Sequence, residues 1–125
     1  MRDGKLRDLE KIDYALLNID KIQVEGKRLE KLGIDSDDEM YVDLMAFYIS
    51  QIGEQFSSSG ISEDTLSIFP DLQAIAPEIS GMRNIVAHVY HRKDSTLIRS
   101  TVVNDIPELK IMLKEVREFL TNNLS

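Results

Sequence analysis

The chain has 125 residues, with 15 Lys and Arg against 22 Asp and Glu, so its formal charge is −7, and it contains no Cys. A chain of this length buries roughly two-thirds of the surface that its unfolded form exposes, which is enough for one hydrophobic core, and we expect a single domain over residues 1–125. The lack of Cys excludes disulfides, a thiol nucleophile and an iron–sulfur cluster, and no apolar run approaches the ~18 residues of a membrane span, so we expect a cytoplasmic protein without membrane contact.

The first third of the chain predicts two helices. Apolar residues spaced by three or four indicate an amphipathic helix over about residues 4–24. The pattern can continue to Gly33, but Gly26 weakens its middle, so one long helix and two shorter pieces are both open. The run from Ser36 to Glu39 matches a capping box, which predicts a second helix that ends near Phe56. Its carboxylates alternatively form a cation site, but the capping interpretation explains both identity and position.

The rest of the chain also predicts helices. Ser62 can start a short helix that Pro70 breaks, and Pro77 suits the first turn of a helix that runs to about His91. A turn at 93–95 and a short helix follow, and Asn104 or Asp105 caps the last helix, with Pro107 in its first turn. No alternating pattern long enough for a sheet appears. The predicted fold is all-α, a four- to five-helix up-and-down bundle.

Positive charge is concentrated in one window. Residues 1–80 carry 8 basic and 17 acidic side chains, whereas residues 81–100 carry 4 basic and 1 acidic side chain. Both histidines, His88 and His91, lie in that window. Any chemistry of this chain is therefore expected there.

A helical wheel of residues 81–92 separates an apolar face from a polar one. The apolar face holds Met82, Ile85, Val86 and Val89, and the other face holds Arg83, Asn84, His88, Tyr90, His91 and Arg92. An arginine can hold a phosphate through two hydrogen bonds, and a histidine can move a proton near neutral pH. Cleavage of RNA without a metal needs both functions. Taken alone, such a face is more often simply solvated, and a metal is not expected because His88 and His91 have no third ligand nearby.

The stretch from Met82 to Tyr90 resembles the signature of the HEPN superfamily. Arg-x4-His-x-Tyr preceded by Gly-Met is similar to its HepT-like branch, whose members are toxins of HepT–MntA toxin–antitoxin pairs. Ile52-Gly53-Glu54 resembles a recurrent Ile-Gly-Glu of that branch. The resemblance extends over most of the chain and implies an all-helical domain.

The resemblance also implies an activity and partners. Similar proteins are metal-independent endoribonucleases without cofactors, and their homodimers join two Arg-x4-His elements in one composite site. Arg83 would bind phosphate, His88 would act as general acid or base, and Asn84 would orient the histidine or the phosphate. Apart from the resemblance, the basic side chains next to the motif lead us to expect that His91, Arg92 and Lys93 contact RNA. A minimal nucleotidyltransferase antitoxin would transfer AMP to Tyr90. The competing hypothesis is a non-catalytic helical module that binds a nucleotidyltransferase and presents a substrate or regulates it.

Overall fold

The computed structural model describes residues 2–85 and 95–124, and within these ranges it contains helices and no strand, which confirms the all-α prediction. The elements in chain order are α1 (Arg2–Lys31), α2 (Glu39–Glu54), α3 (Glu63–Leu66), α4 (Pro70–Gly81), the 3₁₀-helix η1 (Met82–Asn84), α6 (Ser95–Ser100), the π-helix η2 (Thr101–Asp105) and α7 (Ile106–Asn122).

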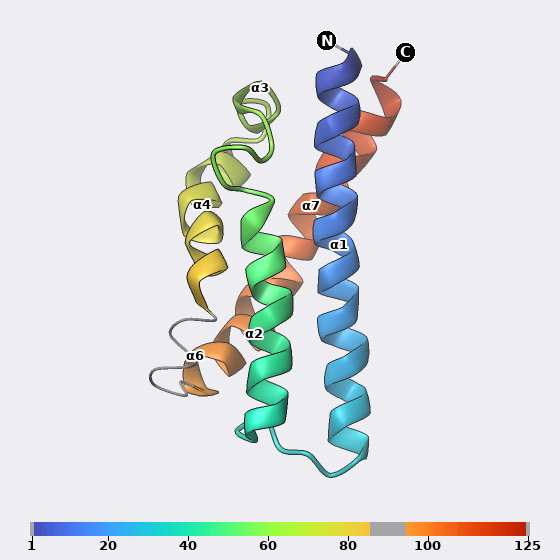
Figure 1. Ribbon diagram of the computed structural model, residues 1–125. Coiled ribbons are helices and arrows are strands. Elements are labelled where there is room, and N and C mark those ends of the chain that lie inside the picture. The colour runs from blue at the N-terminus through green and yellow to red at the C-terminus, as the bar shows by residue number, and fades with distance from the viewer. Residues whose placement is uncertain (1, 86–94, 125) are drawn as a thin grey trace.

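Helix α1, with 30 residues, pairs with two other helices of the bundle. It packs against both α2 and α7, and the ends of the chain lie side by side because α7 runs antiparallel to α1 (Figure 1). Polar contacts join α1 to the C-terminal part: Lys5 Nζ donates to the Asn123 carbonyl at 3.2 Å, Arg117 Nε to Asp13 Oδ1 at 2.6 Å, and Lys110 Nζ to Gln23 Oε1 at 2.7 Å. Helix α4 packs on α2. None of the helices in the described ranges is long and apolar enough to cross a membrane.

The hydrophobic core lies where these helices meet. Its fully buried side chains come from α1, α2, α6 and α7, and include Ile12, Ile19, Met45, Ile49, Ile98 and Leu113. Each of these residues has an exposed fraction of 0%. The apolar residues that recur every three or four positions in α1, α2 and α7 thus form the face that each helix buries.

The structure answers the open question about the first helix, because α1 is one continuous helix from Arg2 to Lys31. It ends in a Schellman motif: the Ile34 amide donates to the Leu29 carbonyl and the Gly33 amide to the Glu30 carbonyl, both at 3.0 Å. Gly33 has a φ of +79°, a left-handed conformation that favours glycine. The expected stop at Gly33 is confirmed.

The capping residue of α2 differs from the predicted one. The cap is Asp38, whose Oδ1 accepts a hydrogen bond from the Met40 amide at 2.8 Å, and Ser36 lies in the preceding turn. The prediction of Ser36 as the cap was wrong because the Asp38 amide bonds to the Asp35 carbonyl, which closes residues 35–38 into a turn before the helix begins. Asp38 is extended, with φ −66° and ψ 139°, as an N-cap requires.

The short helix predicted at Ser62 is confirmed as α3, and it is fastened to α1 by a buried carboxylate. Asp8 on α1 is 3% exposed. Its Oδ1 accepts from the Ser62 amide at 3.0 Å, and its Oδ2 accepts from the Ser62 hydroxyl at 2.6 Å and from the Thr65 hydroxyl. A negative charge at the first turn of α3 is favourable because the free amides of a helix N-terminus point toward it.

The helix that precedes the candidate motif begins earlier than predicted. Pro70 occupies the first turn of α4, and Pro77 lies inside that helix, so the prediction of Pro77 in the first turn was wrong. An internal proline removes one backbone hydrogen bond. The break at Phe69-Pro70 is confirmed, since the helix starts there with Phe69 as its N-cap. Helix α4 ends at Gly81 and continues as the 3₁₀ turn η1, so the helix expected to run unbroken to His91 changes its geometry at Met82.

The last helix begins at the predicted place but without the expected capping hydrogen bond. Asp105 occupies the N-cap position of α7, and Pro107 lies in the first turn, as predicted. Helix α6, the π-helix η2 and α7 form one uninterrupted helical run, and Asp105 is helical itself and makes no side-chain cap. The capping bond is absent because a helix that continues from the preceding turn leaves no free amides to satisfy. The Ile106 amide donates a hydrogen bond to the carbonyl of Thr101, five residues earlier. This spacing widens the helix directly before Pro107.

Candidate functional site

The structure places two of the expected site residues on η1. Arg83 and Asn84 are exposed there, whereas Met82 is half-buried and Ile85 is buried in the core, as the apolar face of the wheel predicted. Across Met82–Asn84 the helical wheel must be corrected, because a 3₁₀ turn rotates about 120° per residue instead of about 100°.

The remaining expected site residues lie outside the described residues. These are His88, Tyr90, His91, Arg92 and Lys93. The structure therefore describes the arginine and asparagine of the candidate motif, and the assignment of the other five stays a prediction.

Helix α2 holds the backbone of Arg83 through Gly53. A Cβ atom built on Gly53 would lie 2.5 Å from the Arg83 amide nitrogen, 2.8 Å from the Ile79 carbonyl oxygen and 3.0 Å from the Met82 carbonyl carbon. Only glycine permits helices to approach this closely. The Ile-Gly-Glu segment and the first residue of the Arg-x4-His motif, 30 positions apart in sequence, are thus in direct backbone contact.

The Arg83 side chain is accessible and has no ion-pair partner in residues 2–85 and 95–124. Its backbone is fixed by α2 while its guanidinium is exposed. This arrangement suits a side chain that binds an anion from solution, because none of the carboxylates in the described ranges has to be displaced first.

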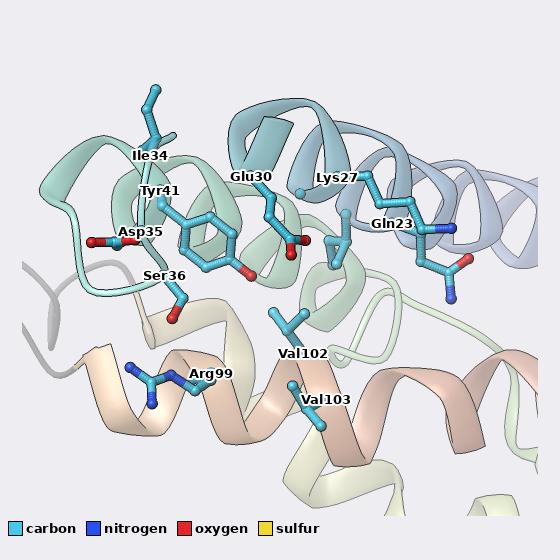
Figure 2. Close-up of a pocket in the computed structure, with 12 residues that line it drawn as sticks. Gln23, Lys27, Glu30, Ile34, Asp35, Ser36, Tyr41, Arg99, Val102 and Val103 are labelled. Carbon is cyan, nitrogen blue, oxygen red and sulfur yellow. The ribbon is translucent and has the colours of Figure 1, made fainter. Parts of the chain in front are cut away.

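A cavity of about 450 Å³ lies between the C-terminal half of α1 and the run from α6 to η2 (Figure 2). Lys27, Glu30, Asp35 and Arg99 bring two charges of each sign to its lining, and no ion pair joins any of them to another described residue. No sequence pattern indicates this cavity, because its walls come from segments about 70 positions apart.

Tyr41 projects into the middle of this cavity, and its hydroxyl points toward Glu30 (Figure 2). The ring is 9% exposed. Burial raises the pKa of the Tyr41 phenol above its ordinary value of 10.0, Arg99 opposes this shift and Glu30 adds to it. Arg99 belongs to the basic window 81–100 of the sequence, but it lines this cavity. The basic side chains of that window are therefore not all gathered around Arg83.

The described residues contain no group of three or more His, Cys, Asp or Glu side chains arranged to hold a metal ion. Of the acidic cluster after α1, Asp38 is used as the N-cap of α2.

The comparisons with known proteins agree with the architecture. A protein-family model described as "Ribonuclease HepT-like" matches residues 12–116, more than four-fifths of the chain. The chain therefore belongs to the HepT-like ribonuclease family. No curated protein and no solved structure gives a significant match.

Proposed function

We propose that the chain is a metal-independent endoribonuclease that acts as the toxin of a toxin–antitoxin pair in the cytoplasm. The observation that carries this proposal is the contact between Gly53 and the Arg83 backbone, since it joins the two sequence elements that characterise the family resemblance. The guanidinium of Arg83, which is exposed and has no ion-pair partner in the part of the chain that the structure describes, supports it as well, and so does the family match.

In the proposed reaction, His88 takes the proton of a ribose 2′-hydroxyl, and the 2′-oxygen attacks the adjacent phosphorus. The O2′–P bond forms, the P–O5′ bond breaks, and the leaving 5′-oxygen receives a proton. The guanidinium of Arg83 donates two hydrogen bonds to the phosphate oxygens, where negative charge grows in the transition state. Asn84, next to Arg83 on η1, orients the phosphate or the histidine. The products are a 2′,3′-cyclic phosphate and a 5′-hydroxyl.

The active form in this proposal is a homodimer in which two Arg-x4-His elements face one RNA strand. His91, Arg92 and Lys93 then add positive charge beside the site. Since the chain is otherwise acidic, RNA is attracted only at this place, and binding weakens as the salt concentration rises.

The proposed antitoxin is a minimal nucleotidyltransferase that modifies Tyr90. The phenolic oxygen attacks the α-phosphorus of ATP, the bond to the β-phosphate breaks, and pyrophosphate leaves. The AMP adds a negative charge two residues after His88, where it competes with the RNA phosphate for Arg83.

The test compares cleavage of single-stranded RNA in the presence of EDTA by the wild type and by four variants. Arg83→Ala and His88→Ala are expected to lose activity about a hundredfold or more. Tyr90→Phe is expected to keep it and to resist inactivation by the neighbouring nucleotidyltransferase with ATP. Arg7→Ala, which removes an exposed arginine of α1, is the matched control and should cleave like the wild type.

Two results contradict the proposal. Folded Arg83→Ala and His88→Ala proteins that cleave RNA at the wild-type rate rule out the assigned catalytic residues. A wild type that cleaves no RNA but binds the nucleotidyltransferase supports the non-catalytic module instead.

A further inference from the structure

A groove with an apolar floor and acidic rims runs between α4 and α7. At one end, a hollow of about 220 Å³ has the apolar side chains Ile75, Met82, Leu109 and Met112 in its lining, together with Glu78, Asp105 and Glu108. At the other end, a hollow of about 210 Å³ adds Ile68, Phe69 and Leu72, together with Asp71 and Glu115. Both hollows share Met112, so they adjoin each other along α7, and we refer to them together as the α4–α7 groove.

Among residues 2–85 and 95–124, the lining of this groove contains five carboxylates and no Lys, Arg or His. On the α4 side this follows from the sequence, because residues 32–82 include no basic side chain at all. The carboxylates on this side of the groove therefore have no basic side chain in their own segment that could neutralise them.

On the α7 side, two of the three basic side chains are directed toward α1. Lys110 donates to Gln23 of α1 at 2.7 Å, and Arg117 bonds to Asp13 of α1 at 2.6 Å. Glu108 and Glu115 lie on a different side of α7 and line the groove. Lys110 and Arg117 therefore contact α1, whereas these two carboxylates face the groove.

Apolar surface remains uncovered along this groove. Ile68 is 47% exposed, and Ile111, one turn from both Glu108 and Glu115 on α7, is 63% exposed. At the far end the groove is bounded by Phe69 and Phe119, whose rings pack edge to face with centroids 5.7 Å apart. At the near end Met82 directly precedes Arg83.

From these observations we infer that the α4–α7 groove binds a basic amphipathic helix of a partner protein. The apolar side of such a helix covers the floor, and its Lys or Arg side chains reach the five carboxylates on the rims. Helix α4 has 12 residues and is about 18 Å long, so the groove accommodates about three to four turns of the partner. RNA is repelled from this surface because the charged side chains that the structure describes in its lining are all carboxylates. The inference does not depend on RNA cleavage.

The experiment uses the full chain and a fluorescent peptide of about 14 residues that places Leu on one face of a helix and Lys on the other. A scrambled peptide of the same composition is the peptide control. We expect the amphipathic peptide to bind at low salt and to bind at least about tenfold more weakly to the double variant Glu108→Lys/Glu115→Lys. The double variant Glu10→Lys/Asp20→Lys on α1 changes the net charge equally, removes two exposed carboxylates away from the groove, and should weaken binding by less than about threefold.

A second readout locates the peptide on the wild type and needs no variant. In a protein labelled at the methionine methyl groups, Met82 and Met112 should shift on binding, while Met45 in the core and Met40 on the surface of α2 should not. Equal weakening by both double variants, no preference over the scrambled peptide, or shifts at Met40 would overturn the inference. So would a change of molecular mass in sedimentation of the groove variant, because the groove would then be covered by a second copy of the chain.

Discussion

The substitution Gly53→Ala tests how tightly α2 holds the backbone of Arg83. The added Cβ would lie 2.5 Å from the Arg83 amide nitrogen, 0.9 Å inside the 3.4 Å at which ordinary van der Waals contact begins. All three of its nearest atoms belong to the backbone, so no side chain can rotate away and the helix α2 must move from η1. Overpacking costs about 1–3 kcal/mol, and the rigid neighbours favour the upper end.

Alanine also has a higher helix propensity than glycine, which offsets about 1 kcal/mol of this cost. We therefore expect Gly53→Ala to lower the free energy of unfolding by about 2 kcal/mol. The matched control is Gly26→Ala in the interior of α1, where the new Cβ would lie 3.9 Å from Tyr41 Cε2, an ordinary contact. That variant should gain about 1 kcal/mol from propensity alone.

The assay is thermal unfolding followed by circular dichroism at 222 nm. For a chain of this size 1 kcal/mol corresponds to roughly 3–4 °C, so Tm should fall by about 6–8 °C in Gly53→Ala and rise by about 3–4 °C in Gly26→Ala. A Gly53→Ala protein as stable as Gly26→Ala would refute the close contact. If RNA cleavage is measured at a temperature where both variants are folded, Gly53→Ala should lose activity and Gly26→Ala should retain it.

Two further predictions concern polar groups inside the bundle. Asp8→Ala should lower the free energy of unfolding by about 2–4 kcal/mol, because the Ser62 amide and the Ser62 and Thr65 hydroxyls lose a buried acceptor; urea titration measures this, and a loss no larger than that of Glu10→Ala contradicts it. The raised pKa of Tyr41 means that the folded state holds the phenolic proton more tightly than the unfolded state, so stability falls as the pH rises above 10.0. Unfolding measured between pH 9 and 11 should show a smaller alkaline loss in Tyr41→Phe, and an identical loss in both proteins contradicts the assigned burial.

Local sequence patterns predicted the helices and their ends correctly where only one nearby residue satisfied the rule for a helix start or stop. The periodicity of α1, the stop at Gly33 and the cap at Ser62 are each determined by residues within a turn of one another. The prediction for the first turn of α4 was wrong because Pro70 and Pro77 both satisfy the preference for proline at the start of a helix. Only the packing of α4 on α2 selects between them. The cap at Ser36 failed for a related reason, since Asp38 two residues later is an equally good acceptor.

The candidate site was predictable in part. The sequence singled out Arg83 and Asn84 as polar and exposed, and both are exposed in the structure. It gave no indication that Gly53 touches Arg83, because that contact joins residues 30 positions apart and leaves no periodic signal. The cavity around Tyr41 and the α4–α7 groove are likewise made of segments that are distant in sequence.

The charge of −7 has a different meaning once its distribution in space is known. Lys5, Lys110 and Arg117 make polar contacts in the seam between α1 and the C-terminal part, whereas Arg83 stays exposed and unpaired among the described residues. Met82, the residue before it, lines a groove in which every charged side chain among the described residues is negative. A polyanion is therefore attracted to Arg83 and repelled from the adjoining groove. A basic protein segment is attracted to the groove, whose near end lies beside Arg83. Arg83 and the groove that Met82 lines thus attract partners of opposite charge. Both associations should weaken as the salt concentration rises.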